Sequence, residues 1–241
     1  MIDFLLNNNF YLYTILEFSA AITGIVYFKK YNKTPVKYFI YFLIFIAFAD
    51  LLCAYNYFIR PNKFLYFLKG TKFEKNHWWA NIYWVIGAIL FYAFYYQRIL
   101  KTALFKKIIK TLHYAFLVFS LIYIALHWEA FFNSFFAVLD LSGALIIFVC
   151  TVFYFIEVLL SEKILYFYTS ISFYISATIF IWWLITAPLS FYDVYYKYEV
   201  GKSFYDQEFH DLRRLIFLFS NIFMYITFIF AFIWCKPENE S

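Results

Sequence analysis

The sequence contains few residues that break helices, cross-link the chain or carry charge. Among 241 residues there are 5 glycines, 4 prolines and 3 cysteines, and only 15% of the residues are charged. So little polar surface cannot cover a soluble globule of this length, which excludes a soluble domain. The three cysteines, Cys53, Cys150 and Cys235, lie in or at the ends of apolar runs without metal-ligand spacing. Neither a disulfide framework nor a zinc site is therefore indicated.

Motifs for the common reaction classes are also missing. The chain has no GxSxG elbow and no glycine-rich phosphate loop. Its histidines are isolated from one another, and the last apolar run contains neither a histidine for a seven-span metal hydrolase nor a lysine for retinal. The sequence thus indicates no catalytic residue, no metal and no cofactor.

Apolar residues make up 65% of the chain, and the mean hydropathy is +0.69. The sequence predicts an all-α integral membrane protein with a single seven-helix transmembrane domain over residues 1–241, because each apolar run approaches the length that a bilayer requires. No nucleic-acid role is assigned to the net charge of +5, since the basic residues lie between the apolar runs. The expected spans are residues 10–28, 38–58, 79–97, 112–128, 132–160, 164–187 and 214–235.

Lysines predict the orientation of the bundle. The loop KKYNKTPVK and the loop RILKTALFKKIIK are strongly basic, which places both in the cytoplasm, the N-terminus outside and the C-terminus inside. The loop between the second and third spans obeys this rule poorly, because it is expected outside yet carries five basic residues and one acid. In the loop RILKTALFKKIIK, aliphatic residues alternate with lysines as on a membrane-surface helix. The two basic cytoplasmic loops are therefore expected to contact lipid or a protein partner.

An acidic residue in a long apolar run is the most informative feature of the sequence. The run 131–160 holds Asp140 on a stripe of small and polar residues that begins at Asn133, and acids at such depth face protein or a water-filled cavity. Counting residues from the predicted ends of other spans places further polar residues in the outer halves of those spans. Together they form the predicted ligand-binding set: Glu17, Asp50, Asp140, Asn81, Asn221, Arg213 and Arg214.

Two interpretations of this polar set are open. It could line an outward-facing pocket for a cation, a proton or a small polar ligand, or the acids could pair with Arg213, Arg214 or helix hydroxyl groups and fix the packing of the bundle. The pocket favours a non-enzymatic membrane sensor or accessory subunit. A small transporter is the alternative, although few glycines and prolines interrupt the spans. A membrane-embedded hydrolase using Asp140 or Asp50 comes third, since a nucleophile and metal ligands are missing.

The segment 192–211 is the longest expected loop. Around Gly201 and Lys202 it predicts a short hairpin, which would form either a lid over the outer pocket or a simple connector with interfacial aromatic residues.

Three stretches carry a resemblance: TILEFSAAITGIVYFKKYNKTPVKYFIYFLIFIAFADLL, NIYWVIGAILFYAFYYQRILK and NIFMYITFIFAFIWCK. The chain resembles a group of small seven-helix inner-membrane proteins frequent in Bacteroidota. The resemblance implies a multi-pass protein of the bacterial inner membrane. Because some members are encoded near sensor kinases, it also implies a signalling role with such a kinase as partner. The group has no established activity, so no catalytic residue can be transferred.

Overall fold

The structure is a computed structural model and describes residues 2–199 and 207–237. Every named element in these residues is helical, and seven helices are long and apolar enough to cross a membrane, in agreement with the predicted fold class. The long elements are α1 (Ile2–Val26), α3 (Val36–Cys53), α6 (Ala103–Leu126), α8 (Ala137–Leu159), α9 (Ile171–Glu199) and α10 (Gln207–Trp234), together with a composite helix of α4 (His77–Ala80), η3 (Asn81–Ala88) and α5 (Ile89–Ile99). Short helices α2 (Phe28–Tyr31) and α7 (Trp128–Asn133) connect them.

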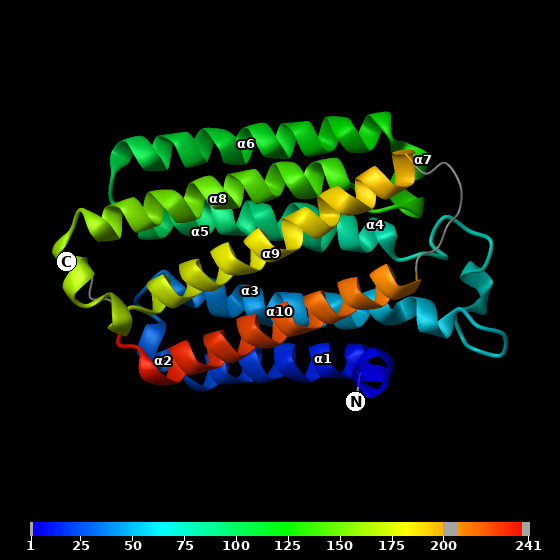
Figure 1. The fold of residues 1–241 in the computed structure, drawn as a ribbon, viewed down its shortest axis with the longest axis horizontal. Coiled ribbons are helices and arrows are strands. Elements are labelled where there is room, and N and C mark those ends of the chain that lie inside the picture. The colour runs from blue at the N-terminus through cyan, green and yellow to red at the C-terminus, as the bar shows by residue number, and fades with distance from the viewer. Residues whose placement is uncertain (1, 200–206, 238–241) are drawn as a thin grey trace.

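The long helices lie side by side, with α6 and α1 at opposite edges of the bundle (Figure 1). Helix α1 packs against α10 and α3, α10 packs against α9, and α9 packs against α8, which also contacts α5 and α6. Helix α1 begins at one end of the bundle and α10 finishes at the other (Figure 1). We call these the N-terminal end and the C-terminal end.

Three spans begin well before the residue that the sequence pattern predicts, among them α10, which begins at Gln207 instead of residue 214. Helix α1 begins at Ile2 instead of residue 10, and α6 begins at Ala103 instead of residue 112. The predicted surface helix with alternating lysines is therefore the first part of α6. Its lysines are accommodated because the amphipathic pattern continues the helical period of the apolar span without a break.

The predicted span 132–160 is interrupted. Asn133 ends α7, Ser134 is extended, and α8 begins only at Ala137, so Asn133 does not belong to the stripe that carries Asp140. The Asn133 amide donates to the Glu129 carbonyl oxygen of its own short helix. Hydropathy could not reveal this break, because phenylalanines continue through it.

The predicted hairpin in the segment 192–211 is wrong over the described residues. Helix α9 continues through Pro188 to Glu199, where the sequence pattern predicted the span to end at residue 187. Proline removes one helical hydrogen bond, but membrane helices tolerate it because neighbouring groups satisfy the freed carbonyl. Gly201 and Lys202, the predicted turn, lie outside the described residues.

Close approach of backbones holds the centre of the bundle together. At Gly143 of α8, an added Cβ would lie 1.7 Å from Cδ1 of Ile89, which is itself fully buried.

At the C-terminal end, the Tyr31 hydroxyl donates to the carbonyl oxygens of Phe232 and Cys235, at 3.2 and 2.9 Å. Burial raises the pKa of Tyr31, which keeps this hydroxyl a donor to the free carbonyls at the end of α10.

Candidate functional site

Helices α1 and α3 each contribute one carboxyl group to the interior of the bundle. Glu17 on α1 is only 7% exposed, and Asp50 on α3 is partly buried. Small residues let the two helices approach closely: Ala20 and Ala21 are buried, and Gly24 lies against Ile40. Glu17 and Asp50 are therefore oriented toward protein, as predicted for acids in membrane spans.

Two further helices supply a hydroxyl group to each acid. The Tyr225 hydroxyl on α10 donates to Oε1 of Glu17 at 3.0 Å. The Tyr83 hydroxyl on η3 donates to Oδ1 of Asp50 in a short hydrogen bond. Both tyrosines are buried, with at most 5% of their surface exposed. We call Glu17, Asp50, Tyr83 and Tyr225 the acid–tyrosine cluster; it joins the first three spans of the chain to the last one.

The two carboxyl groups of the cluster also lie close enough to interact electrostatically. Two carboxylates repel each other, so a proton on either acid would relieve this repulsion. The arrangement is thus chemically suited to hold one exchangeable proton. A cation that replaced this proton would find carboxylate and hydroxyl oxygens, the ligands that hard cations prefer.

Other polar side chains surround the cluster. Cys53, one helical turn after Asp50, interacts with Tyr83 and accepts a hydrogen bond from Asn76 at 3.3 Å. Tyr13, one turn before Glu17, interacts electrostatically with both acids and also with Arg213 and Arg214. Because α10 begins at the N-terminal end, Tyr13, Arg213 and Arg214 lie between that end and the acids, and we call these three residues the polar track.

Glu17 lies deeper than the sequence predicts. The early start of α1 places Glu17 beyond the middle of its helix instead of near its outer end, and Asp50 lies past the middle of the span Val36–Phe58 that runs in the opposite direction. Two helices that run in opposite directions therefore bring these acids together near the centre of the bundle. Asp50 lies in the half of its span nearer the N-terminal end, as predicted, whereas Glu17 lies just past the middle of its span.

Asp140 does not belong to the cluster. It lies in the first turn of α8, and its Oδ2 accepts a hydrogen bond from the Ser190 hydroxyl of α9 at 2.8 Å. Helix α8 packs on α9, α5 and α6, whereas α1 packs on α10 and α3. The three predicted acids thus divide between two helix interfaces, because a helical count gives depth but not which neighbour a helix meets.

Asn81 forms a structural joint. Its amide nitrogen donates to the carbonyl oxygens of Phe131 and Ser134, at 3.3 and 2.9 Å, and its Oδ1 accepts from the backbone N–H of Phe136 at 3.1 Å. The side chain is fully buried. These bonds use its two donors and one acceptor, so Asn81 holds the turn between α7 and α8 and offers little to a ligand.

Asn221 links two helices outside the cluster. Its Oδ1 accepts a hydrogen bond from the Trp182 indole of α9 at 3.1 Å, and its nitrogen donates to the Phe217 carbonyl oxygen at 2.9 Å. This amide therefore ties α9 to α10, and these two hydrogen bonds do not involve Glu17 or Asp50.

The two arginines contact other groups than the acids of the cluster. Arg214 donates to the carbonyl oxygen of Leu6 and lies 3.8 Å from Asp211. The guanidinium of Arg213 lies 4.9 Å from the ring centre of Phe217, a cation–π geometry. Among the described residues, Glu17 and Asp50 accept hydrogen bonds from tyrosine hydroxyl groups. Of the partners named in the structural interpretation, these two acids therefore have hydroxyl groups and not arginines.

Sequence analysis overlooked Tyr83 and Tyr225. With 25 tyrosines in the chain, a single one carries little information. One signal was available: Tyr225 follows Asn221 by one turn and so lies on the same face of the last helix. No comparable pattern points to Tyr83, which acquires its position from the π-helical stretch η3.

A cavity of about 760 Å³ opens at the C-terminal end, between the α5–α6 connection, the end of α8 and the residues after α10. Its lining carries charges of both signs, with Glu157 and Glu162 facing Lys101 and Lys236. Glu157 accepts hydrogen bonds from the backbone N–H groups of Lys101 and Thr102 and thereby caps α6. The acid–tyrosine cluster contributes no residue to this cavity.

Within residues 2–199 and 207–237, no three His, Cys, Asp or Glu side chains lie close enough together to bind a metal ion. The chain matches no protein-family model, and no curated protein or solved structure is significantly similar to it. A proposal about function therefore rests on the geometry described above.

Proposed function

We propose that the chain is a non-enzymatic membrane sensor or accessory subunit whose sensing element is the acid–tyrosine cluster. The observation that carries the proposal is the meeting of Glu17 and Asp50 under hydroxyl groups of Tyr83 and Tyr225. A single proton held between the acids connects α1 and α3 directly, and η3 and α10 through the tyrosines. Loss of this proton places repelling charges between α1 and α3, and replacement by a larger cation requires the acids to move apart, so either event changes how the four helices pack.

The bundle would present this element to the outside and report to the inside. Lysines of the C-terminal end favour a cytoplasmic location for that end, which puts the N-terminus outside. The polar track through Tyr13 then connects the cluster with the outer surface. A partner, such as a sensor kinase in the bacterial inner membrane, would contact the basic loops at the cytoplasmic end. The resemblance to small inner-membrane proteins of Bacteroidota supports this assignment.

The polar track also supports a second candidate function, transport of a proton or a small cation. Both functions need a protonatable pair, but they differ in net movement of the ion across the bilayer. Flux into proteoliposomes that is lost in Asp50→Asn would support transport and contradict a purely sensory role.

Infrared difference spectroscopy of the reconstituted protein tests the sensing element. Stepping between acidic and alkaline pH should change a carbonyl band of a protonated carboxyl group, because the shared proton enters or leaves. Glu17→Gln and Asp50→Asn should each remove or shift this band. Asp140→Asn is the matched control, since Asp140 pairs with Ser190 in another interface and its replacement should leave the band in place.

Helix movement is measured separately with spin labels at two exposed positions, Ile22 on α1 and Phe48 on α3. We expect the distance between the labels to change with pH in the parent protein and to become independent of pH in the Glu17→Gln, Asp50→Asn double variant. A distance that stays constant in the parent protein while the infrared band responds would refute signalling by helix movement.

A further inference from the structure

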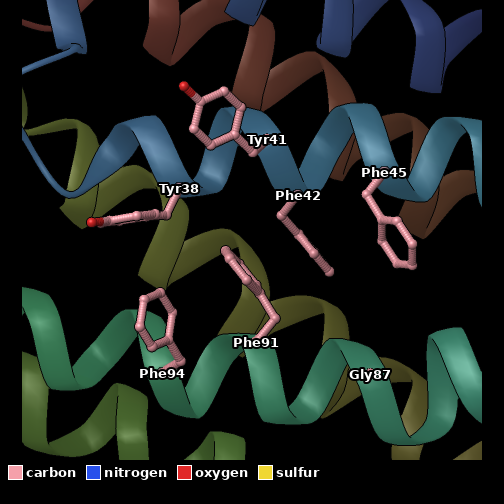
Figure 2. A pocket seen from close by; sticks show the side chains of 7 residues that line it. All are labelled: Tyr38, Tyr41, Phe42, Phe45, Gly87, Phe91 and Phe94. Atoms are coloured by element: carbon pink, nitrogen blue, oxygen red, sulfur yellow. The ribbon is translucent and has the colours of Figure 1, made fainter.

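A hollow lined by aromatic rings lies on the surface of the bundle between α3 and the η3–α5 helix. It has a volume of about 340 Å³ and is lined by Tyr38, Tyr41, Phe42, Phe45, Gly87, Phe91 and Phe94. The lining residues of α3 recur at helical spacing, as do those of η3 and α5, so each helix presents one continuous stripe. Figure 2 shows Phe42 and Phe45 on the side of α3 that faces Phe91, whereas the ring of Tyr41 lies on the other side of α3 in this view.

Ring packing fixes the shape of this groove. Phe42 and Phe91 stack with 3.9 Å between their centroids, and Tyr38 meets Phe94 edge to face at 5.3 Å. Across from Phe45 no side chain projects, because Gly87 occupies that position (Figure 2). A Cβ at Gly87 would lie 3.0 Å from the carbonyl oxygen of Ile82, so the wide turn of η3 also leaves little room for a side chain there. Tyr41 and Phe45 are about half exposed, which leaves the groove open along its side.

Positive charge is concentrated at one end of the groove. The guanidinium of Arg98 lies 5.0 Å from the ring centre of Phe94 and 6.0 Å from that of Tyr38. The Lys37 ammonium lies 5.1 Å from the Tyr38 ring centre. Both cations stand at the C-terminal end, where α3 begins and α5 ends. The opposite end of the groove, at Phe45 and Gly87, is apolar.

We propose that this groove binds one anionic phospholipid, with an acyl chain along the aromatic stripes and the phosphate between Lys37 and Arg98. The chain would run from Tyr38 to Phe45, about 10 Å along the helix, and pass over Gly87. Two cations beside an apolar channel complement the two parts of such a lipid, one anionic and one hydrocarbon. A zwitterionic lipid would bind less tightly, since the positive charge of its headgroup would be repelled by Lys37 and Arg98.

This site is independent of the acid–tyrosine cluster but adjoins it. The groove separates α3 from η3, the same two elements that Tyr83 and Asp50 join on the inner side. A lipid in the groove would therefore fix the spacing of these helices, whether or not the cluster acts as a sensor.

Photo-crosslinking tests the proposal on the full-length protein in phosphatidylcholine vesicles. A phosphatidylglycerol probe with a photoreactive group on its acyl chain should label peptides that contain residues 38–45 and 87–94. The Lys37→Gln, Arg98→Gln variant should lose this labelling by about tenfold or more, because two charges near the phosphate are removed. The Lys107→Gln, Lys110→Gln variant carries the same charge change on exposed positions of α6 and should retain the labelling.

Three results would overturn the proposal. Equal labelling by a phosphatidylcholine probe would make the groove an ordinary boundary-lipid surface. Equal loss in both double variants would indicate general attraction to the basic end. Crosslinks from groove residues to a second copy of the chain would show that protein, not lipid, covers this surface. Retention of the native elution volume in both variants shows that a loss of labelling does not reflect unfolding.

Discussion

The hydroxyl of Tyr83, on the π-helical stretch η3, donates a hydrogen bond to the carboxyl group of Asp50 on α3. Trp79, one turn earlier, donates from its indole to the carbonyl oxygen of Ala49 at 2.8 Å. Two consecutive residues of α3 thus receive hydrogen bonds from the same neighbouring helix. The carboxyl group of Asp50 is held by contacts that pack the bundle, so a change in its charge acts directly on that packing.

We expect Tyr83→Phe to destabilise the protein by about 0.5–2 kcal/mol, since it removes one interhelical hydrogen bond in the membrane interior. In a double-mutant cycle, Tyr83→Phe should cost less in the Asp50→Asn background than in the parent protein. Reversible unfolding in mixed detergent measures both free energies. Equal costs in the two backgrounds would show that Tyr83 stabilises the bundle without acting through Asp50.

Asn81→Ala should cost about 2–5 kcal/mol, because three buried backbone groups of the α7–α8 turn lose their partner. The matched control is Asn133→Ala, which removes an exposed amide that bonds only within its own short helix. Thermal unfolding followed by size-exclusion chromatography compares the two variants. Equal melting temperatures would contradict the role of Asn81 as the joint of this turn.

Gly143→Ala should destabilise the contact between α8 and α5 by about 1–3 kcal/mol, since the new methyl group would overlap the side chain of Ile89. Adding Ile89→Val should recover part of this loss by removing a methyl group from the overlap. Ser142→Ala, on the preceding residue, serves as the control. A Gly143→Ala protein as stable as the parent would indicate that α8 can shift away from α5 at little cost.

Glu157→Ala should weaken the start of α6 by about 1 kcal/mol, because the backbone N–H groups of Lys101 and Thr102 lose their acceptor. Hydrogen exchange of residues 103–106 should accelerate, while the middle of α6 should exchange as before. Glu162→Ala removes an exposed carboxyl group at the same end of the bundle and should leave α6 unchanged. Acceleration in both variants would point to the overall charge of this end and not to capping.

The predicted site illustrates the limits of a helical count. Glu17 and Asp50 were expected to meet and do meet, because small residues mark the faces on which α1 and α3 approach. Asp140 was expected beside them and lies in another interface with Ser190. Asn81 and Asn221 were expected to line the same pocket, but their observed partners are a turn and a tryptophan, which no periodicity identifies. Their ligand-binding role, and that of the arginines, stays a prediction.

Hydropathy alone determined that the chain forms seven long apolar helices, because a segment of membrane length must satisfy its backbone hydrogen bonds internally. Composition also determined that acids within these helices turn toward protein. Which helices become neighbours, where α7 breaks from α8, and which tyrosines reach Glu17 and Asp50 were decided only by the tertiary structure. The physical reason is that lipid-facing and protein-facing apolar residues look alike in sequence, so helix pairing depends on the fit of side chains such as Gly143 against Ile89.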